Sequence, residues 1–543
     1  MRTKTLKTIP PPYTILALGP FSPVPETGFS VNIVPVETPT IQEAFGQLSP
    51  RLWIPAPTDI CPPGGLTLQP SGLRDLTPDG LIQTTPYLKD LCDAGEFVAK
   101  GHTSGTAPAD IADQVQSTWP HLPLDLSIPT ASAQQATRHD SAVDDILSMV
   151  AMPGGADQGE PRSVGGPADW KRQIEGLLSA NIDCIFNNEE FRALEAAWQG
   201  LECLFLRGGV REEEGGKVVL KIVPASAATL PAALKCLAIE LATDTPDLIL
   251  IDLPMDNTPG GGEALERIAA FATTLLTPTA TWITPAFFHL DNWRKLHRLP
   301  YLKHHLDSAV YAKWRKLREQ RSGQWLTLTC NRFLTRAPYG ENNRPRSVAF
   351  TETKPLWISP VWALGTMAAQ SVNQFGWPSR LTDYMRVRLK DLAVSVQGSE
   401  TASATETIFP EDRIRQFVEI GITPLAGAPG QDTAFMPKAV VASGESLLSQ
   451  MFFSRIIGFL IRLREDCEEN DGETEPASFV AAALTSFFEA TGQEPPDDLW
   501  VTAGAYPEGH RQGEEASLPL DIAFTPPRAV SPDSRKLAFT FSW

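Results

Sequence analysis

The chain has 543 residues, of which 42% are hydrophobic and thirteen are Trp, which indicates folded cores and room for about two to four domains. Its net charge of −18 disfavours nucleic acid and anionic lipid as partners and favours a cationic protein surface. The seven Cys are an odd number without a CxxC pair, which argues against a disulfide framework or a zinc knuckle and is typical of a cytoplasmic protein.

The N-terminal end is basic and lacks the continuous apolar core of a signal peptide, so export by that route is not expected. Residues 3–8 alternate with basic side chains and are a candidate short strand, which three prolines at 10–12 separate from the rest. This orphan strand is either a disordered terminus or an arm that adds to the sheet edge of another molecule. The arm residues are Thr3, Thr5 and Leu6.

The next hundred residues predict a small α/β unit. Thr77 precedes Pro78, which suits the first position of a helix that is expected to continue through Leu91. The other elements expected here are strands at 13–19, 29–36, 51–54 and 66–68, and a helix at 40–48 with Thr38 or Thr40 as its cap.

Residues 100–168 are rich in Ala, Ser, Thr, Gly, Pro and Asp, a composition that is typical of a flexible linker. Within them, residues 141–150 have apolar side chains at helical intervals. Such a short helix either docks on its own protein or is a ligand helix for another protein. Its apolar residues are Val143, Ile146, Leu147 and Val150.

A long helix is predicted to start at Asn187, whose side chain would cap it while Glu190 bonds back to the Asn187 amide. Gly208 and Gly209 are expected to end it. Apolar residues recur at steps of four, three and four, so they should form one buried stripe with the charged residues mostly outside it. The stripe consists of Leu194, Trp198, Leu201 and Phe205, and the residues outside it are Glu189, Arg192, Glu195 and Gln199.

Two apolar strands with a helix between them, within residues 217–253, predict a βαβ unit. Residues 248–268 then place a glycine loop between a strand and a helix, an arrangement that can cradle a phosphate. Gly260 and Gly262 lack the third glycine of the dinucleotide pattern, and no Lys-Ser or Lys-Thr follows, so neither nucleotide motif is met. An α/β enzyme or nucleotide-binding protein that uses this loop is the alternative hypothesis.

Three histidines at 297, 304 and 305 raise the question of a metal site. Their neighbours are basic, and neither HExxH nor Cys/His clustering accompanies them, so a solvated basic loop is predicted. The chain also lacks GxSxG, and its acidic pairs are too common to nominate as acid and base. We therefore expect no catalytic residue, no metal and no cofactor.

Residues 447–463 are the most membrane-like stretch, yet Arg455 near their middle would cost roughly 2.5 to 3.5 kcal/mol at a bilayer centre. A buried helix and no membrane insertion are therefore predicted. An acidic run follows, which is either a solvated loop or a surface that grips a partner through weak charge complementarity. The run includes Glu465, Asp466, Glu468, Glu469 and Asp471.

The chain ends in two predicted strands, at 517–525 and 535–543. Apolar side chains alternate along the second strand to the last residue, so it would be an aggregation hazard if left unpaired. These side chains are Leu537, Phe539, Phe541 and Trp543.

Several runs resemble the contractile sheath proteins of type VI secretion systems. Residues 314–340 resemble a stretch of the large sheath subunit TssC (EvpB/VipB-like) that ends "PRFLLRLPYG", with Cys330-Asn331 in place of Leu-Pro. Residues 66–91 resemble the "DFSPxxL" region of the small subunit TssB (ImpB/VipA-like). A core signature resembles the TssC run "EFxxLExxWRGLxxL", with Gln199 at the usual Arg position: Phe191, Leu194, Glu195, Trp198, Gly200 and Leu201.

The resemblance implies an α/β (α+β mixed) contractile tail-sheath fold in which TssB is fused to TssC on one chain. The parts expected are a TssB-like domain at 1–99, a flexible linker at 100–168 with a short helix at 141–150, a TssC-like N-terminal α/β domain at 169–345, and a TssC-like C-terminal sheath domain at 346–543.

The resemblance also implies a structural protein and not an enzyme. Copies would form a helical homo-oligomer of stacked rings around an Hcp-like inner tube and contract to drive it through a target envelope. Neighbours would exchange their terminal strands, and the acidic run would face the tube. Baseplate and distal cap proteins would be further partners. A ClpV-like ATPase would recognise the helix at 141–150, although the chain is shorter around this junction than the two separate subunits, which is compatible with a single-use sheath.

Overall fold

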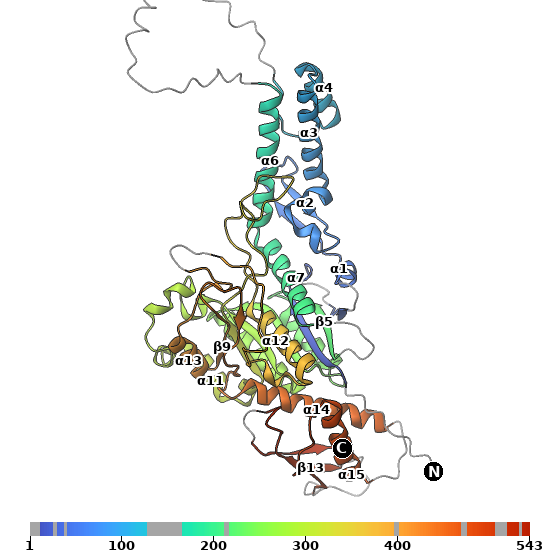
Figure 1. The fold of residues 1–543 in the computed structure, drawn as a ribbon, viewed down its shortest axis with the longest axis vertical. Coiled ribbons are helices and arrows are strands. Elements are labelled where there is room, and N and C mark those ends of the chain that lie inside the picture. The colour runs from blue at the N-terminus through green and yellow to red at the C-terminus, as the bar shows by residue number, and fades with distance from the viewer. Residues whose placement is uncertain are drawn as a thin grey trace, which may run out of the picture.

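The computed structural model describes residues 11–24, 30–36, 41–127, 165–210, 217–395, 401–468, 475–504, 518–531 and 535–543. Figure 1 shows three parts: a helical arm at the top, a body built on a central sheet, and a C-terminal subdomain at the base. The predicted mixed α/β fold is confirmed in this general form.

The body is organised around a seven-stranded sheet in the order β2-β5-β1-β6-β7-β8-β9. Neighbouring strands are parallel except for β2, which is antiparallel to β5. Strands β1 and β8 are buried along their whole length, as expected when helices cover both faces of a parallel sheet. The strands are β1 (Tyr13–Gly19), β2 (Val34–Val36), β5 (Val218–Pro224), β6 (Leu248–Met255), β7 (Thr279–Ile283), β8 (Leu326–Cys330) and β9 (Ile422–Pro424).

Strand β1 lies in the middle of this sheet, although the sequence suggested a separate N-terminal domain. It pairs with β5 from Tyr13 to Gly19 and with β6 from Ile15 to Leu18. The expected boundary after residue 345 also divides the sheet, because β8 pairs with β9. Both boundaries were drawn from segments that are contiguous in sequence, whereas the sheet is assembled from strands far apart in the chain.

Alternate residues of β1 face two different cores. Ile15 and Ala17 pack in the core formed with α7 (Glu189–Arg207) and α12 (Pro360–Phe375). Leu16 and Leu18 pack in the core formed with α8 (Leu230–Glu240) and α9 (Pro259–Leu275). The sheet is therefore covered on both faces.

The arm consists of α2 (Pro78–Thr84), α3 (Pro86–Thr103), α4 (Pro108–Thr118) and α6 (Pro167–Asn187). Pro78 starts α2 as predicted, and Thr77 caps this helix, since its hydroxyl accepts from the Gly80 amide at 3.1 Å. The helix does not run through to Leu91, because Pro86 starts a new helix after Thr85 adopts an extended backbone.

The flexible linker was predicted to begin at residue 100, and this is wrong for its first part. Helix α3 continues to Thr103, and α4 buries Ile111 and Val115. Composition alone missed α4 because its polar and small residues surround a narrow apolar stripe. The rest of the predicted linker, including the helix at 141–150, lies outside the described residues, except for 119–127 and 165–168.

The strand predicted at 29–36 is shorter, and the helix predicted at 40–48 lacks a side-chain cap.

A lobe beside the body is made of the short helical segments between β7 and β8. The smaller elements are α1 (Gln42–Leu48), a hairpin of β3 (Leu52–Pro55) and β4 (Gly65–Leu68), η1 (Leu73–Leu76), η3 (Pro285–Phe288), η4 (Trp293–Arg298), α10 (Leu302–His305), η5 (Ala309–Tyr311), α11 (Ala312–Glu319), η6 (Arg321–Gln324), η7 (Pro378–Arg380), α13 (Glu411–Glu419), β10 (Ala426–Gly427) and β11 (Ala434–Phe435).

The C-terminal subdomain packs two helices against a three-stranded antiparallel sheet in the order β12-β13-β14. Its helix α14 is the long apolar helix that the sequence predicted. The elements are α14 (Leu447–Glu468), α15 (Pro476–Ala490), β12 (Trp500–Ala503), β13 (Pro519–Phe524) and β14 (Leu537–Ser542).

Candidate functional site

At the glycine loop after β6, the helix end is capped by the loop's own side chains, and cavities of about 300 and 330 Å³ lie beside it. Thr258 caps α9, with its hydroxyl accepting from the Gly261 amide at 3.1 Å. The Asp256 carboxylate in turn accepts from the Thr258 amide at 3.0 Å and from its hydroxyl at 2.6 Å. A phosphate at this helix end would meet the Asp256 carboxylate and would compete with the cap for the Gly261 amide.

The carboxyl end of β1 is the point where open α/β sheets of this strand order bind ligands, because the chain crosses to the other side of β1 there. In this protein the position is filled by aromatic rings. Phe21 lies edge-on to Trp198 at 5.5 Å and to Trp362 at 6.0 Å between ring centroids. All three side chains are fully buried, so the crevice is part of the core.

Asp252 on β6 lies in the same core and is buried. Burial raises the pKa of its carboxyl group, while hydrogen bonds to it act in the opposite direction. One of these comes from the Trp362 indole Nε1, which donates to the carboxylate at 2.7 Å. The carboxylate thus positions Trp362 and is not exposed to a substrate.

The core signature lies on α7, which joins the arm to the body. The predicted cap at Asn187 is wrong by one residue: Asn187 ends α6, and Asn188 caps α7 by accepting from the Phe191 amide at 3.0 Å. The signal was ambiguous because two adjacent Asn residues can both cap. The helix ends at Arg207 as expected, and its predicted apolar stripe is buried.

The packing of α7 against α12 explains why the signature has glycine at position 200. A Cβ added there would lie 2.3 Å from Trp362 Cδ1, so α7 and α12 can approach each other only because residue 200 has no side chain. Trp198 also ties α7 to the N-terminal segment, since its indole Nε1 donates to the Phe21 carbonyl at 2.9 Å.

Glu195 was expected mostly outside the buried face of α7, and this is wrong, because only 2% of the residue is exposed. Its carboxylate accepts from Arg336 Nε at 2.9 Å, and Arg336 also donates to Glu352 at 2.7 Å. Arg192 adds a second cation, 3.5 Å from Glu352. Arg336 and Glu352 were missed as partners because they lie far from α7 in sequence, and no local pattern marks Glu352.

Arg455 on α14 is buried, as predicted for a helix that does not cross a membrane. Its guanidinium donates to the Asp247 carboxylate at 3.2 Å and to the Pro11 carbonyl at 3.2 Å. It also lies over the ring of Tyr13 at 5.4 Å. One side chain therefore joins the C-terminal subdomain, the central sheet and the start of the described N-terminal segment. Among the described residues, no helix is both long and apolar enough to span a bilayer.

The C-terminal strand has a partner within its own chain in this structure, and its exchange between neighbouring copies stays a prediction. β14 pairs with β13 from Leu537↔Phe524 to Ser542↔Pro519. Trp543 extends the ladder by exchanging backbone hydrogen bonds with Leu518 at 2.8 and 2.9 Å. Phe541 is buried and Leu537, Phe539 and Trp543 are half-buried. In the described chain β14 and β12 are the two edges of this sheet.

Thr3, Thr5 and Leu6, the helix with Val143, Ile146, Leu147 and Val150, and the acidic residues Glu469 and Asp471 lie outside the described residues. Of the remaining acidic residues, Glu465, Asp466 and Glu468 occupy the last turn of α14.

The three histidines are not one solvated group. His297 and His304 are exposed, but His305 is half-buried, with its Nε2 3.0 Å from the Tyr311 hydroxyl. Burial lowers the pKa of His305. In the part of the chain that the structure describes, no three His, Cys, Asp or Glu side chains are grouped to hold a metal ion.

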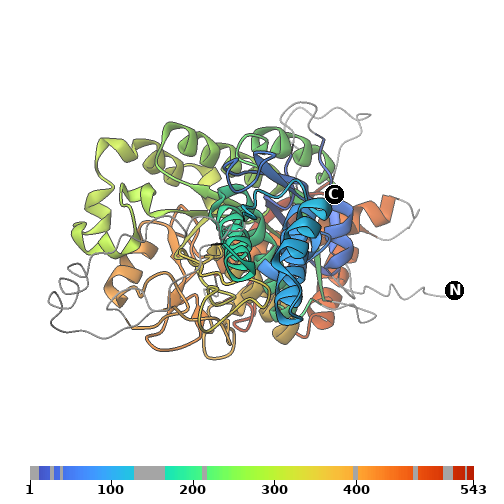
Figure 2. The same cartoon turned by 90° about the horizontal axis from the view of Figure 1, so that it is seen from above.

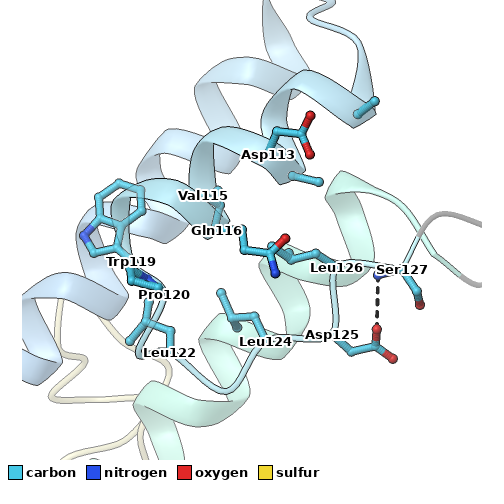
Figure 3. Close-up of a pocket in the computed structure, with 12 residues that line it drawn as sticks. Asp113, Val115, Gln116, Trp119, Pro120, Leu122, Leu124, Asp125, Leu126 and Ser127 are labelled. Carbon is cyan, nitrogen blue, oxygen red and sulfur yellow. Dashed lines mark hydrogen bonds between the residues drawn. The ribbon is translucent and has the colours of Figure 1, made fainter.

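A cavity of about 640 Å³ lies at the tip of the arm, between α4 and the segment that follows it. Figure 3 shows Val115 and Trp119 on one side and Leu122, Leu124 and Leu126 on the other. The segment turns at Asp125, whose carboxylate accepts from the Ser127 amide at 3.1 Å. The cavity thus ends directly before residue 128.

Residues 246–442 match the family model of the EvpB/VC_A0108 tail sheath N-terminal domain, named VipB. The chain is also 24% identical over 234 residues to the type VI secretion system sheath protein TssC1 of Pseudomonas aeruginosa. That alignment covers 38% of this chain and 46% of TssC1, so the chain spans less than half the length of the curated relative it matches.

These matches support a TssC-like sheath protein. The matched family is structural and not enzymatic, and the crevice at β1 is filled by Phe21. The matched range also crosses the domain boundary predicted after residue 345.

Proposed function

We propose that this chain is a fused subunit of a contractile sheath, in a type VI secretion system or a related contractile injection system. It would polymerise in the cytoplasm as stacked rings around an Hcp-like inner tube and contract to drive that tube through a target envelope. The observation that carries the proposal is the match of the central body to the tail sheath family.

The TssB-like part is supported by the place of β1. Without residues 1–99, β5 and β6 would lose the strand between them, and two buried edges would be left unpaired in the middle of the sheet. Fusion keeps the small and large parts at a ratio of one to one. Every central sheet therefore receives the β1 strand that it needs.

Strand exchange is proposed at the base of the molecule. The Arg455–Pro11 hydrogen bond places the start of the described chain beside α14, close to the C-terminal subdomain. The arm with Thr3, Thr5 and Leu6 would add to a free edge of a neighbour's three-stranded sheet. Residues 537–543 would pair with β13 of a neighbour through the ladder now seen within one chain, which is a low-cost swap because the same hydrogen bonds form in both states.

The acidic run from Glu465 to Asp471 is proposed to face the inner tube, since weak charge pairing lets a sheath release its tube on contraction. The helix at 141–150 is proposed as the ligand helix of a ClpV-like ATPase. Its place in the chain supports this, because the described arm tip ends at Ser127, shortly before that helix. Baseplate and distal cap proteins complete the proposed partners.

Electron microscopy of the purified full chain, alone and with an Hcp-like tube protein, tests the proposal. We expect hollow or tube-filled cylinders that sediment together with the tube protein. Deletion of residues 1–10 should abolish cylinders while near-UV circular dichroism stays native, and deletion of 535–543 should abolish them as well. Cylinders of normal length from both deletions would refute strand exchange, and a full chain that stays monomeric at high concentration would refute the sheath assignment.

A further inference from the structure

The charges of the chain are divided between two regions. Residues 465–521 carry fifteen Asp and Glu against one Arg, a net charge of −14 out of the −18 of the whole chain. Residues 294–321, here called the basic lobe, carry nine Lys and Arg against two Asp and Glu. A chain with a net charge of −18 therefore presents one strongly basic region.

The basic lobe is folded so that more than half of its cations face solvent. Trp293, Trp314 and Leu317 anchor η4 and α11 in the core, which leaves the basic faces of these helices outside. Five of the cations are exposed, and among the described residues none of them forms an ion pair. These are Arg298, Lys303, Lys313, Lys316 and Arg321.

Apolar side chains lie among these cations. Tyr301 is 41% exposed and Val310 is 58% exposed. A charged surface with exposed aromatic and aliphatic residues is typical of a protein interface and not of a solvated loop.

The acidic counterpart lies between α15 and β12. Glu489, Glu494 and Asp497 are exposed, and within the described ranges no cation pairs with them. Trp500 beside them is 54% exposed. The turn is held in place by Asp498, whose carboxylate accepts from the Thr525 amide and hydroxyl at 2.8 Å each. We call these residues the acidic turn.

The basic lobe and the acidic turn do not meet within one chain. Figure 1 shows α11 at the side of the body and α15 at its base, and Figure 2 shows the lobe on the side away from the C-terminus. No ion pair between described residues joins them. Each copy therefore carries two complementary surfaces that do not meet within that copy.

We propose that the basic lobe of one copy docks on the acidic turn of the next copy. This contact is heterologous, because it joins two different surfaces, and repeating it builds rings or a helix instead of a closed pair. Tyr301 and Val310 on one side and Trp500 on the other supply the apolar part of the interface. The proposal rests on the sheath function and deepens it by naming a contact that does not use the terminal strands.

Another copy fits this lobe better than nucleic acid does, because the overall charge of the chain repels phosphate backbones. A second copy also has the right stoichiometry, because each chain carries one basic lobe and one acidic turn. The apolar residues on both surfaces would exclude water from the charge pairs and make them less sensitive to salt than exposed pairs.

Charge reversal tests the contact in the full chain. Variant A carries Lys313→Glu, Lys316→Glu and Arg321→Glu, and variant B carries Glu489→Lys, Glu494→Lys and Asp497→Lys. Each should need a protein concentration at least about tenfold higher than the wild type to sediment as polymer, because three attractive pairs become repulsive. The matched control carries Arg51→Glu, Lys89→Glu and Lys235→Glu, three exposed cations elsewhere, and should polymerise like the wild type.

Mixing the two variants gives the decisive result. A reversed lobe and a reversed turn attract each other again, so an equimolar mixture of A and B should polymerise near the wild-type concentration. Thermal unfolding of each variant checks that it is folded. The proposal is overturned if A polymerises like the wild type, or if folded A and B fail to polymerise together. In the first case polymers still form, so the sheath function survives; a wild-type chain that never polymerises overturns both.

Discussion

Two buried arginines hold the molecule together in different ways. Arg336 is enclosed by Glu195 and Glu352, and all three belong to the body around α7. Arg455 has one carboxylate partner, Asp247, and its other contacts come from the N-terminal segment and the C-terminal subdomain. The first network stabilises one core, whereas the second joins parts of the chain that are more than 200 residues apart.

This difference shows where the protein is rigid and where it can come apart. The body has several aromatic and ionic contacts around α7 and α12, so the loss of one contact leaves the others. The C-terminal subdomain depends on a charged side chain at its junction with the sheet. We expect a single substitution at the junction to loosen only the C-terminal subdomain. A single substitution in the body should lower the stability of the whole fold.

Arg336→Met should have the largest effect. It leaves Glu195 and Glu352 as buried carboxylates with only Arg192 nearby, so the free energy of unfolding should fall by about 5 kcal/mol, near the upper end for breaking a buried ion pair. Urea unfolding followed by Trp fluorescence measures this. Lys100→Met, which breaks an exposed pair with Glu96, is the control and should change stability by less than about 0.5 kcal/mol. Equal effects of the two variants would contradict the assigned role.

Arg455→Met should cost about 3 kcal/mol, because Asp247 keeps one hydrogen bond, from the Thr14 amide at 2.7 Å. The loss should be local: hydrogen exchange should speed up in β12–β14 and stay slow in β1 and β6. Arg462→Met on the same helix is the control, since Arg462 pairs with the exposed Asp244. Uniformly faster exchange in the whole chain would show that Arg455 is not a junction residue.

Gly200→Ala should cost about 2 kcal/mol, because its Cβ would push against the buried Trp362 ring. Gly176→Ala on α6 is the matched control. Nothing lies within 4 Å of an added Cβ there, so this variant should gain up to about 1 kcal/mol from its better helix propensity. Thermal unfolding of both variants gives the comparison, and a loss of stability in both would remove the packing explanation.

The smallest effect is expected from Asp252→Asn and appears as a pH dependence. Burial raises the pKa of Asp252 above its ordinary value of 3.8, so the folded state binds the proton more tightly than the unfolded state. Stability therefore falls as the pH rises from that value through the folded pKa, by about 1.4 kcal/mol for each unit by which the pKa is raised.

Asp252→Asn should lack this decline, because the amide oxygen still accepts from Trp362 and has no charge to bury. Urea unfolding at a series of pH values compares the variant with the wild type and with Asp183→Asn, a control at an exposed position on α6 that should keep the decline. Identical slopes in all three proteins would mean that Asp252 does not titrate in this way.

The sequence by itself determined most of the local structure. The strands at 13–19 and 66–68, the Pro78 helix start, the buried stripe of α7 and the buried helix around Arg455 all follow from side-chain periodicity and from capping or turn residues. The runs around Trp198 and 314–340 also carried the sheath resemblance. Such features depend on residues a few positions apart, and neighbouring residues are visible in a sequence.

The tertiary structure alone decided how the parts combine. It placed β1 between β5 and β6, buried Glu195 against Arg336, filled the crevice at β1 with Phe21 and closed the C-terminal strand on its own chain. Each of these joins residues from distant parts of the chain, and a single sequence contains no local pattern for such pairs. The physical reason is that a buried charge or an unpaired strand demands a partner without specifying which one, and the choice is made by packing.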